Sequence, residues 1–507
     1  MDESRSSSRG AWLLIGLIAL VAAGKVVLAD TMDPDAFWHL RVADQMTRDG
    51  VGPLVDTLSF ASDKTPWTPY SWLAELVMKW TWDAGGYRAT ILLTALCSAT
   101  IVCMTALTCR VPRVGTPSRG WPSTYSDPEP STARNTKPWH PADLTTVLAT
   151  AIAAYFTLAF ISFRPVTFAL ALLSIVIYLL YRDRAMRHRS RAVWIVPALV
   201  VLITNLHIYS AFALCLTMIV AIGSFSEERP QFKRMFLLSV LTFLAACCTP
   251  MLPGMIETSM RYNAVDPMVA ATFIREMRPF YEGVGGKVSL AIVGLIVLFA
   301  IRNRRHLRAS DWMLLIFGFV VLARLGRFAP VFALIVMPIF ARSLPPMKGT
   351  ALRKKPIQIA IAAVLVIGLI NIATQFPRSS MTFDAWLNRH TPAVPGYPTA
   401  AAAFVLAHVH PEHHRVFNEF DWGGYLAWRL GADWQVFLDG RTQLYTPDFW
   451  RRAFFQTKDD QRALLSSYVA DAAIIPAKRS AFRDSLESLG WAVAYEDPIA
   501  VVMIKNE

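Results

Sequence analysis

The apolar residues of this chain are gathered into long runs that are separated by short polar turns. A helix that crosses the hydrocarbon core of a bilayer needs about 20 predominantly apolar residues. Several runs are short for this role, and their predicted ends carry a tolerance of about two to four residues. About eleven spanning helices are predicted, at Ala11–Ala29, Arg88–Thr108, Leu144–Ile161, Val166–Tyr181, Val193–Thr204, Ile208–Gly223, Met235–Thr249, Val288–Ile301, Trp312–Ala323, Phe328–Ala341 and Ile357–Thr374.

Three segments outside these runs are long enough to carry chemistry, namely 30–86, 250–287 and the chain from 376 onwards. The first of them opens with apolar residues at helical spacing, which predicts an amphipathic helix that lies in the membrane interface. Tryptophans further along the same segment predict a second interfacial stretch. The helix positions are Phe37, Leu40, Ala43 and Met46, and the tryptophans are Trp67, Trp72, Trp80 and Trp82.

The chain changes in character near residue 376, where short apolar runs typical of buried strands alternate with amphipathic helical stretches. The predicted fold is therefore a multi-pass α-helical membrane region over 1–375, followed by a small α/β domain over 376–507. Strands are predicted at Arg415–Phe420, Gln435–Asp439, Ala472–Ile475, Trp491–Glu496 and Ile499–Lys505. Helices are predicted at Gly424–Leu430, Asp448–Phe455, Gln461–Tyr468 and Ala481–Leu489.

Composition supports the membrane class. Hydrophobic residues make up 54% of the chain and charged residues only 17%, whereas soluble domains carry about 25% charged residues. The mean hydropathy is +0.37. The chain is thus too apolar for an ordinary soluble protein of this length.

The distribution of Lys and Arg predicts the orientation. With a cytoplasmic N-terminus, the inward-facing segments hold 24 basic residues against about 11 in the outer loops. The positive-inside rule therefore places the N-terminus inside and the C-terminal domain outside. The net charge of +13 is explained by this asymmetry, and no nucleic-acid partner is expected.

The N-terminus allows a second interpretation. Arg5 and Arg9 precede the first apolar run, and Val27-Leu28-Ala29 fits a signal-peptidase site. The length of the run and Lys25 near its outer end favour a retained span. All six cysteines lie in or beside predicted spans, so no disulfide framework is expected.

Asp33 and Asp35 lie two residues apart where the chain leaves the first span, with His39 one helical turn further on. Two converging carboxylates can bind a divalent cation such as Mg²⁺ or Mn²⁺, or one can act as a general base while the other positions it. The plainer explanation is a solvated acidic cap on the following helix.

Basic and amide side chains recur at the outer turns between predicted spans. An arginine binds phosphate in a bidentate manner, although one at a membrane surface can also simply reach lipid headgroups. These residues are predicted on the same side of the membrane as the aspartate pair, which favours a phosphate-binding site. The residues are Arg164, Asn205, His207, Arg324 and Arg327, with Glu276 in the loop before the eighth span.

The sequence resembles the GT-C superfamily of bacterial membrane glycosyltransferases, which use polyprenyl-phosphate-linked sugars. The resemblance rests on motifs spread over most of the chain, and it is to an uncharacterised branch. The outer-loop motifs are Asp33-Pro-Asp35-Ala-Phe-Trp-His39-Leu, Gly52-Pro53, Trp72-Leu-Ala-Glu75, Phe163-Arg164-Pro165, Asn205-Leu-His207, Ile274-Arg-Glu276 and Arg324 to Arg327-Phe-Ala-Pro; those of the C-terminal domain are Phe417-Asn, Gly423-Gly424-Tyr-Leu and Val436-Phe-Leu-Asp439-Gly440-Arg441.

The resemblance implies an enzyme of the bacterial inner membrane that transfers a hexose or pentose to a glycan, lipid or protein, with inversion. Asp35, or else Asp33, would deprotonate the acceptor or align a metal ion. Arg164, Arg324 and Arg327 would bind the leaving phosphate. His39, Asn205, His207 and Glu276 would support the site or contact substrate. An acidic or histidine residue is expected just before Trp72, but the chain has Tyr70-Ser71 there.

Other classes stay open at this point. A lipid-sugar transporter would carry its polar groups near mid-bilayer and show inverted repeats, and neither is visible. A non-catalytic scaffold would use the α/β domain to bind a partner. A ligase or polymerase of the O-antigen type would have its main outer loop late in the chain. Asp439-Gly440-Arg441 is interpreted as a strand-ending turn with a local ion pair.

Overall fold

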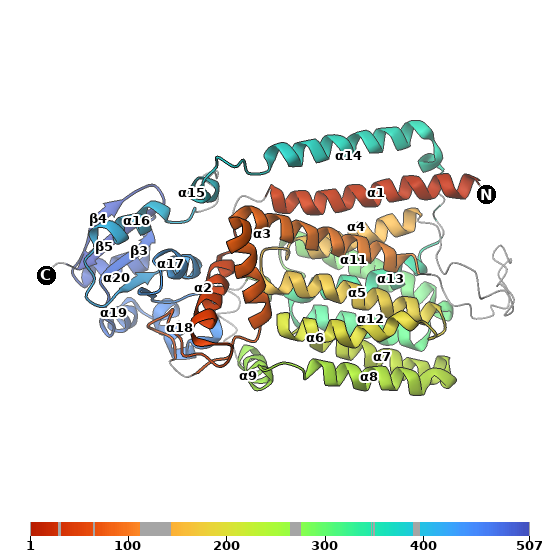
Figure 1. Cartoon of the computed structure of the whole chain (residues 1–507), viewed down its shortest axis with the longest axis horizontal. Coiled ribbons are helices and arrows are strands. Elements are labelled where there is room, and N and C mark those ends of the chain that lie inside the picture. The colour runs from red at the N-terminus through yellow and green to blue at the C-terminus, as the bar shows by residue number, and fades with distance from the viewer. Residues whose placement is uncertain are drawn as a thin grey trace.

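The computed structural model describes residues 2–28, 32–63, 66–111, 143–263, 275–345, 347, 350–388 and 396–505. Ala29 of the alternative signal-peptidase site, most of the loop 109–143 and residues 264–274 of the second outer loop lie outside these ranges. Figure 1 shows a bundle of long, roughly parallel helices with a smaller domain at one end. Helix α1 runs from the opposite end of the bundle towards that domain.

Each of the eleven predicted runs overlaps a helix of the bundle. Seven of the described helices are long and apolar enough to cross a membrane, so the chain is a multi-pass membrane protein; the full number of spans stays a prediction. The bundle helices are α1 Asp2–Val27, α3 Trp72–Cys109, α4 Leu144–Leu158, α5 Pro165–Ala185, α6 Val196–Leu206, α7 Ser210–Glu227, α8 Phe232–Ala246, α11 Gly283–Arg302, α12 Ala309–Arg324, α13 Ala329–Ser343 and α14 Lys355–Gln375.

The way these helices begin and end follows local sequence rules. Proline occupies a first-turn position in α5, α6, α13 and α14, where its missing N–H costs nothing. Helix α3 is kinked at Gly85 and Gly86, which have non-helical backbone angles. The apolar window of α14 has no residue buried inside the protein, as expected of a helix that is surrounded by lipid.

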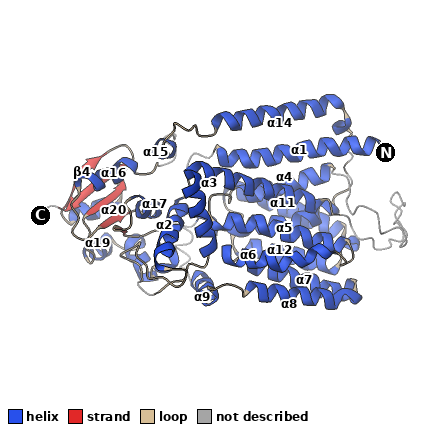
Figure 2. Cartoon of the chain, in the orientation of Figure 1, coloured by secondary structure: helices blue, strands red, loops and turns tan. Residues whose placement is uncertain are grey.

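The C-terminal domain contains a five-stranded sheet in the order β2-β1-β3-β5-β4, seen at one end in Figure 2. Strands β2, β1 and β3 are parallel, whereas β5 is antiparallel to both β3 and β4. The strands are β1 Arg415–Asn418, β2 Gln435–Val436, β3 Ala472–Pro476, β4 Trp491–Glu496 and β5 Ala500–Lys505. The predicted mixed α/β fold is confirmed.

The C-terminal part of the chain also contains short helices, namely α15 Phe383–Leu387, α16 Thr399–His408, α17 Gly423–Arg429, α18 Pro447–Trp450, α19 Lys458–Ser466 and α20 Ala481–Ser488. The strand predicted over Gln435–Asp439 is shorter than expected. The side chain of Asn418 accepts a hydrogen bond from the backbone N–H of Phe437 at 2.8 Å. The same N–H also donates to the Val416 carbonyl at 3.0 Å, so the Asn418 side chain shares the last hydrogen bond between these two strands.

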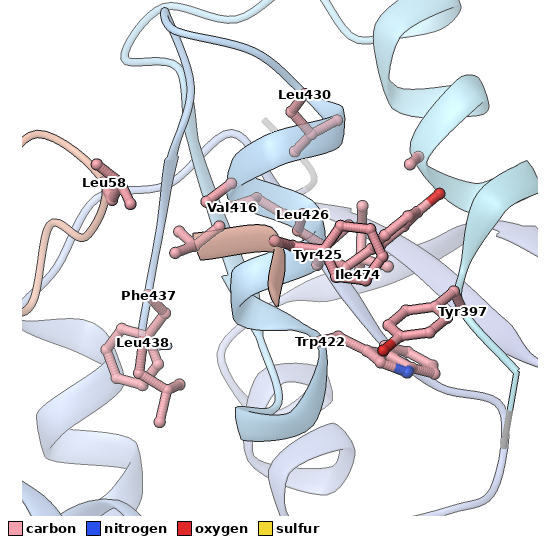
Figure 3. Close-up of a cluster of buried hydrophobic side chains, with 14 of the residues drawn as sticks. Leu58, Tyr397, Val416, Trp422, Tyr425, Leu426, Leu430, Phe437, Leu438 and Ile474 are labelled. Atoms are coloured by element: carbon pink, nitrogen blue, oxygen red, sulfur yellow. The ribbon is translucent and has the colours of Figure 1, made fainter. Parts of the chain in front are cut away.

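The first outer segment is built into the C-terminal domain. It contains α2 (Pro34–Asp49) and an extended stretch that pairs with the sheet edge. Ser59 forms a parallel bridge with Val436, and the backbone N–H of Phe60 donates to the Val436 carbonyl at 3.0 Å. Leu58 therefore packs in the same core as Val416, Tyr425 and Leu438 (Figure 3).

The expectation that the apolar face of α2 lies in the membrane interface was wrong. Phe37 is fully buried, and its ring lies 5.2 Å from that of Tyr425 and 5.4 Å from that of Trp428. An apolar stripe looks the same in sequence whether lipid or protein covers it. The boundary at residue 376 stays a proposal, and the hydrophobic core continues across it.

Candidate functional site

The site begins at the N-terminus of α2. Asp33 is the N-cap, and its Oδ1 accepts a hydrogen bond from the backbone N–H of Asp35 at 3.0 Å. Pro34 fixes the backbone at the first helical position. The indole N–H of Trp38, one turn along, donates to Asp35 Oδ1 at 3.0 Å. Both carboxylates are thus held at the start of the helix, and Asp35 keeps its second oxygen for another partner.

That partner is Arg164, which immediately precedes α5. Its Nε lies 3.2 Å from Asp33 Oδ2 and its Nη1 lies 3.0 Å from Asp35 Oδ2. Its Nη2 forms an ion pair with Glu276. One guanidinium therefore joins three carboxylates from two outer segments that are far apart in sequence. We call these four residues the Arg164 cluster.

A second arginine, Arg327, lies next to the Arg164 cluster. Arg327 Nη2 lies 4.0 Å from Glu276 Oε2. It belongs to the turn between α12 and α13, where Gly326 packs closely on the backbone of the segment that carries Glu276. The predicted residues Asp33, Asp35, Arg164, Glu276 and Arg327 therefore come together.

The electrostatics of the cluster shift the pKa values of Asp35 and Glu276 in opposite directions. Burial and the neighbouring charge of Asp33 raise the pKa of Asp35 to about 6, although Arg164 opposes this shift. Burial would also raise the pKa of Glu276, but Arg164 and Arg327 outweigh it and lower that pKa. Glu276 is thus a fixed negative charge, whereas Asp35 is a base whose proton affinity lies close to neutral pH.

His39 and His207 lie beside the cluster in buried positions. His39 Nδ1 is 3.0 Å from Oε1 of Glu75. Burial, together with Arg164, His207 and Arg441, lowers the pKa of His39. Burial and then Arg327 and Arg164 lower the pKa of His207 to about 3. Both imidazoles are therefore neutral at physiological pH.

Two other predicted residues have different surroundings. Asn205, near the end of α6, joins the start of α3 to the segment after α8: its Oδ1 accepts from the indole of Trp72 at 2.8 Å and its amide donates to the carbonyls of Val201 and Cys248. Arg324 is exposed at the C-terminal end of α12.

Glu75 and Trp38 were not among the predicted site residues. Glu75 is buried and faces His39, one turn after the position where an acidic residue was expected. Tyr70 stands at that position instead, and its ring lies 6.0 Å from His207. A buried acid inside the apolar-looking segment Trp72-Leu-Ala-Glu75 was the available signal. For Trp38 the only signal was its place in the motif Asp33-Pro-Asp35-Ala-Phe-Trp-His39-Leu.

Asp439-Gly440-Arg441 is more than a local turn. Arg441 Nε lies 2.9 Å from Asp439 Oδ1, and its Nη1 lies 2.9 Å from Oδ1 of Asp56 in the first outer segment. All three side chains are fully enclosed. These three residues, the Arg441 cluster, pin the first outer segment to the C-terminal domain.

The predicted metal role of Asp33 and Asp35 can be tested on their arrangement. Within the described part of the chain, no three His, Cys, Asp or Glu side chains form a group that could hold a metal ion. Arg164 occupies the position between the two aspartates where a cation would bind. The residues as arranged do not fit a metal ion.

Comparison with known proteins extends these observations. No family model and no curated protein matches the sequence. The archaeal oligosaccharyltransferase AglB from Archaeoglobus fulgidus, in complex with an inhibitory peptide and a dolichol-phosphate, is similar over 92% of this chain and 69% of its own, with a TM-score of 0.53 and 11% identity. The chain has the GT-C fold.

Two further solved structures are similar to this chain. The apo form of the Archaeoglobus fulgidus oligosaccharyltransferase gives a TM-score of 0.50 at 11% identity over 92% of this chain and 69% of that one. ArnT from Cupriavidus metallidurans bound to undecaprenyl phosphate covers 97% of both chains, with a TM-score of 0.46 and 13% identity. The GT-C fold predicted from the sequence is thus confirmed by the AglB structures.

Proposed function

We propose that this GT-C chain is a membrane glycosyltransferase that moves a sugar from a polyprenyl-phosphate donor to an acceptor hydroxyl of a glycan, lipid or protein. The observation that carries the proposal is the Arg164 cluster. It places a base of raised pKa beside Arg164, which shares Glu276 with Arg327, at the end of the helix bundle and next to a folded domain. AglB, whose fold is similar, is an oligosaccharyltransferase in complex with a dolichol-phosphate.

The reaction is a single displacement. Asp35 takes the proton of the acceptor hydroxyl as its oxygen attacks the anomeric carbon. The bond between that carbon and the phosphate oxygen breaks, and the lipid phosphate leaves with the bonding electrons. Attack opposite to the leaving group inverts the anomeric centre. Hexose and pentose donors are both compatible with this step.

The charged neighbours divide the remaining work. Arg164 holds both aspartates and Glu276 in place, so it acts mainly as a positioning residue in the arrangement described above. Arg327 is the main group that stabilises the negative charge developing on the leaving phosphate, and Arg324, which is exposed at the end of α12, contributes less. Arg164 joins them if the donor phosphate displaces one of its carboxylates.

The location belongs to the same proposal. The chain lies in a bacterial inner membrane with its N-terminus in the cytoplasm and its C-terminal domain outside, as the distribution of basic residues predicts. The site then faces the extracytoplasmic side, where the acceptor is presented.

Replacement of Asp35 tests the proposal. The purified protein in proteoliposomes would be supplied with radiolabelled polyprenyl-phosphate hexoses and pentoses, and transfer to acceptor would be measured. Asp35→Asn keeps the size of the side chain but removes its basicity, so turnover should fall by about 10²–10⁴-fold. The exposed Asp49→Asn, at the end of the same helix, is the matched control and should retain normal turnover.

Two results would contradict the assignment. Near-normal transfer by both Asp33→Asn and Asp35→Asn would exclude this site and make Glu276 the next candidate base. Labelled lipid-sugar that crosses the vesicle membrane without forming any product would indicate a transporter instead.

A further inference from the structure

The turn that carries Gly440 lies directly on Asp35. A Cβ atom at position 440 would overlap Oδ1 of Asp35 and would lie only 3.0 Å from Nε1 of Trp38. Real Cβ atoms do not approach other atoms so closely, so either the carboxylate or the indole would have to move. Only glycine leaves room for Asp35 and Trp38 in their observed positions.

A second glycine of the same domain meets the next part of α2. A Cβ atom at Gly424 would lie 2.7 Å from the carbonyl oxygen of Pro34 and 3.3 Å from the backbone nitrogen of Trp38. Gly424 belongs to α17, which packs along α2. The C-terminal domain therefore touches both the backbone and the side chains of the segment that carries Asp35.

The Gly440 turn is itself rigidly held. The Asp439 backbone N–H donates to the hydroxyl of Tyr445 at 2.8 Å. Arg441 is fully enclosed and pairs with Asp439 and with Asp56, and its guanidinium lies 5.1 Å from the ring centre of Trp67. A buried turn held by two ion pairs cannot shift cheaply to make room for a larger residue.

We propose that the Gly440 turn forms one wall of the site and positions the Asp35 carboxylate, with Oδ1 on Trp38 and Oδ2 on Arg164. The C-terminal domain is then an integral part of the active site. This proposal rests on the proposed function, because it assigns Asp35 as the base. Gly440 is a positioning residue: it acts only through Asp35 and Trp38.

Gly440→Ala tests the positioning role. The methyl group would displace the carboxylate or break its hydrogen bond with Trp38, and a misplacement of about 1 Å can cost about 100-fold in turnover. We expect a loss of that order in kcat with a much smaller change in KM for the donor. Losing the Trp38 hydrogen bond also removes a contact that lowers the pKa of Asp35, so the acidic limb of the pH–rate profile should move to higher pH.

Gly52→Ala is the matched control. Gly52 lies in the first outer segment, and a Cβ atom there would meet nothing within 4 Å. This variant should keep the wild-type kcat and pH profile. Trp38→Phe provides a second route if Gly440→Ala does not fold, because it removes the donor to Asp35 Oδ1 without a clash. It should lower kcat and move the acidic limb in the same direction. Unchanged kcat and pH profile in a folded Gly440→Ala, or in Trp38→Phe, would overturn the positioning role.

A cross-link tests the contact without any activity assay. In the full-length D35C/G440C double variant, mild oxidation should join the two positions. A Cβ atom at position 440 would overlap the side chain of residue 35, and a disulfide joins residues whose Cβ atoms are about 3.5–4.5 Å apart. Protease cleavage between them would then leave fragments that separate only after reduction. The six native cysteines all lie between residues 97 and 248. The single variants D35C and G440C serve as controls, because any disulfide that they form must involve a native cysteine.

The two assays separate the proposals. No cross-link in the folded double variant would overturn the wall contact. A cross-link in a protein whose wild-type form transfers no sugar would instead overturn the proposed function and leave the contact intact.

Discussion

Two arginine–carboxylate clusters lie at the same end of the bundle, yet they differ in access to solvent. In the Arg441 cluster, the side chains of Arg441, Asp56 and Asp439 are all 0% exposed. In the Arg164 cluster, the Arg164 side chain is 14% exposed and that of Asp35 is 32% exposed. The first cluster is sealed inside the protein, whereas the second can be reached from outside.

The difference shows how one kind of ion pair serves two purposes. A sealed ion pair fixes the relative position of two segments, and removing one partner leaves a buried charge uncompensated. A partly exposed pair can exchange a partner for a substrate group or a proton. Access to solvent, more than charge or sequence motif, therefore separates the structural cluster from the candidate catalytic one.

The largest expected effect is on stability, in Arg441→Ala. This change leaves Asp56 and Asp439 buried without their counter-ion, which typically costs about 3–5 kcal/mol. The free energy of unfolding, followed by SDS titration of the purified protein, should fall by that amount.

Arg429→Ala is the control for this measurement. Arg429 pairs with Asp384 in the same domain, but their side chains are 30% and 41% exposed, and a solvent-accessible pair contributes about 0–1 kcal/mol. Equal losses in the two variants would remove the distinction between a sealed and an open pair.

A smaller effect is expected on donor binding, and it distinguishes two neighbouring arginines. Arg327 lies beside Glu276 in the cluster, whereas Arg324 is exposed. Losing a hydrogen bond to a charged group costs about 1.5–3 kcal/mol, so Arg327→Ala should raise KM for the donor by roughly 10- to 100-fold. Arg324→Ala should change KM by only about twofold, because exposed substitutions usually stay within about 0.5 kcal/mol. The reverse order in steady-state kinetics would place the phosphate nearer Arg324.

The smallest expected effect is a shift in the pH dependence of turnover. Asp35 must be ionised to act as a base, and its pKa is raised to about 6. The rate should therefore be full above that pH and fall about tenfold per unit below it. Asp33→Asn removes a charge that raises this pKa, so the acidic limb should move to lower pH. A limb that moves upwards, or does not move in this variant, would contradict the assignment of Asp35.

The sequence predicted more of the fold than of the site. Long apolar runs identified every bundle helix, because the bilayer imposes length and apolarity on each span independently of its neighbours. The short strands around Ala472–Pro476 and Trp491–Glu496 were also recognisable from local patterns. The amphipathic stripe of α2 was found, but its partner was wrongly taken to be lipid.

What the sequence by itself determined about this protein is its class, its apolar helices and the set of polar residues at the turns between them. Only the tertiary structure decided which of them meet: Asp33 and Asp35 with Arg164 and Glu276, and Asp56 with Arg441. The requirement for glycine at position 440 became evident only from its contact with Asp35. The physical reason is the separation along the chain. Hydrophobic periodicity and helix caps depend on residues a few positions apart. These ion pairs and close contacts join segments more than 100 residues apart in sequence, and local patterns do not show which of those segments meet in space.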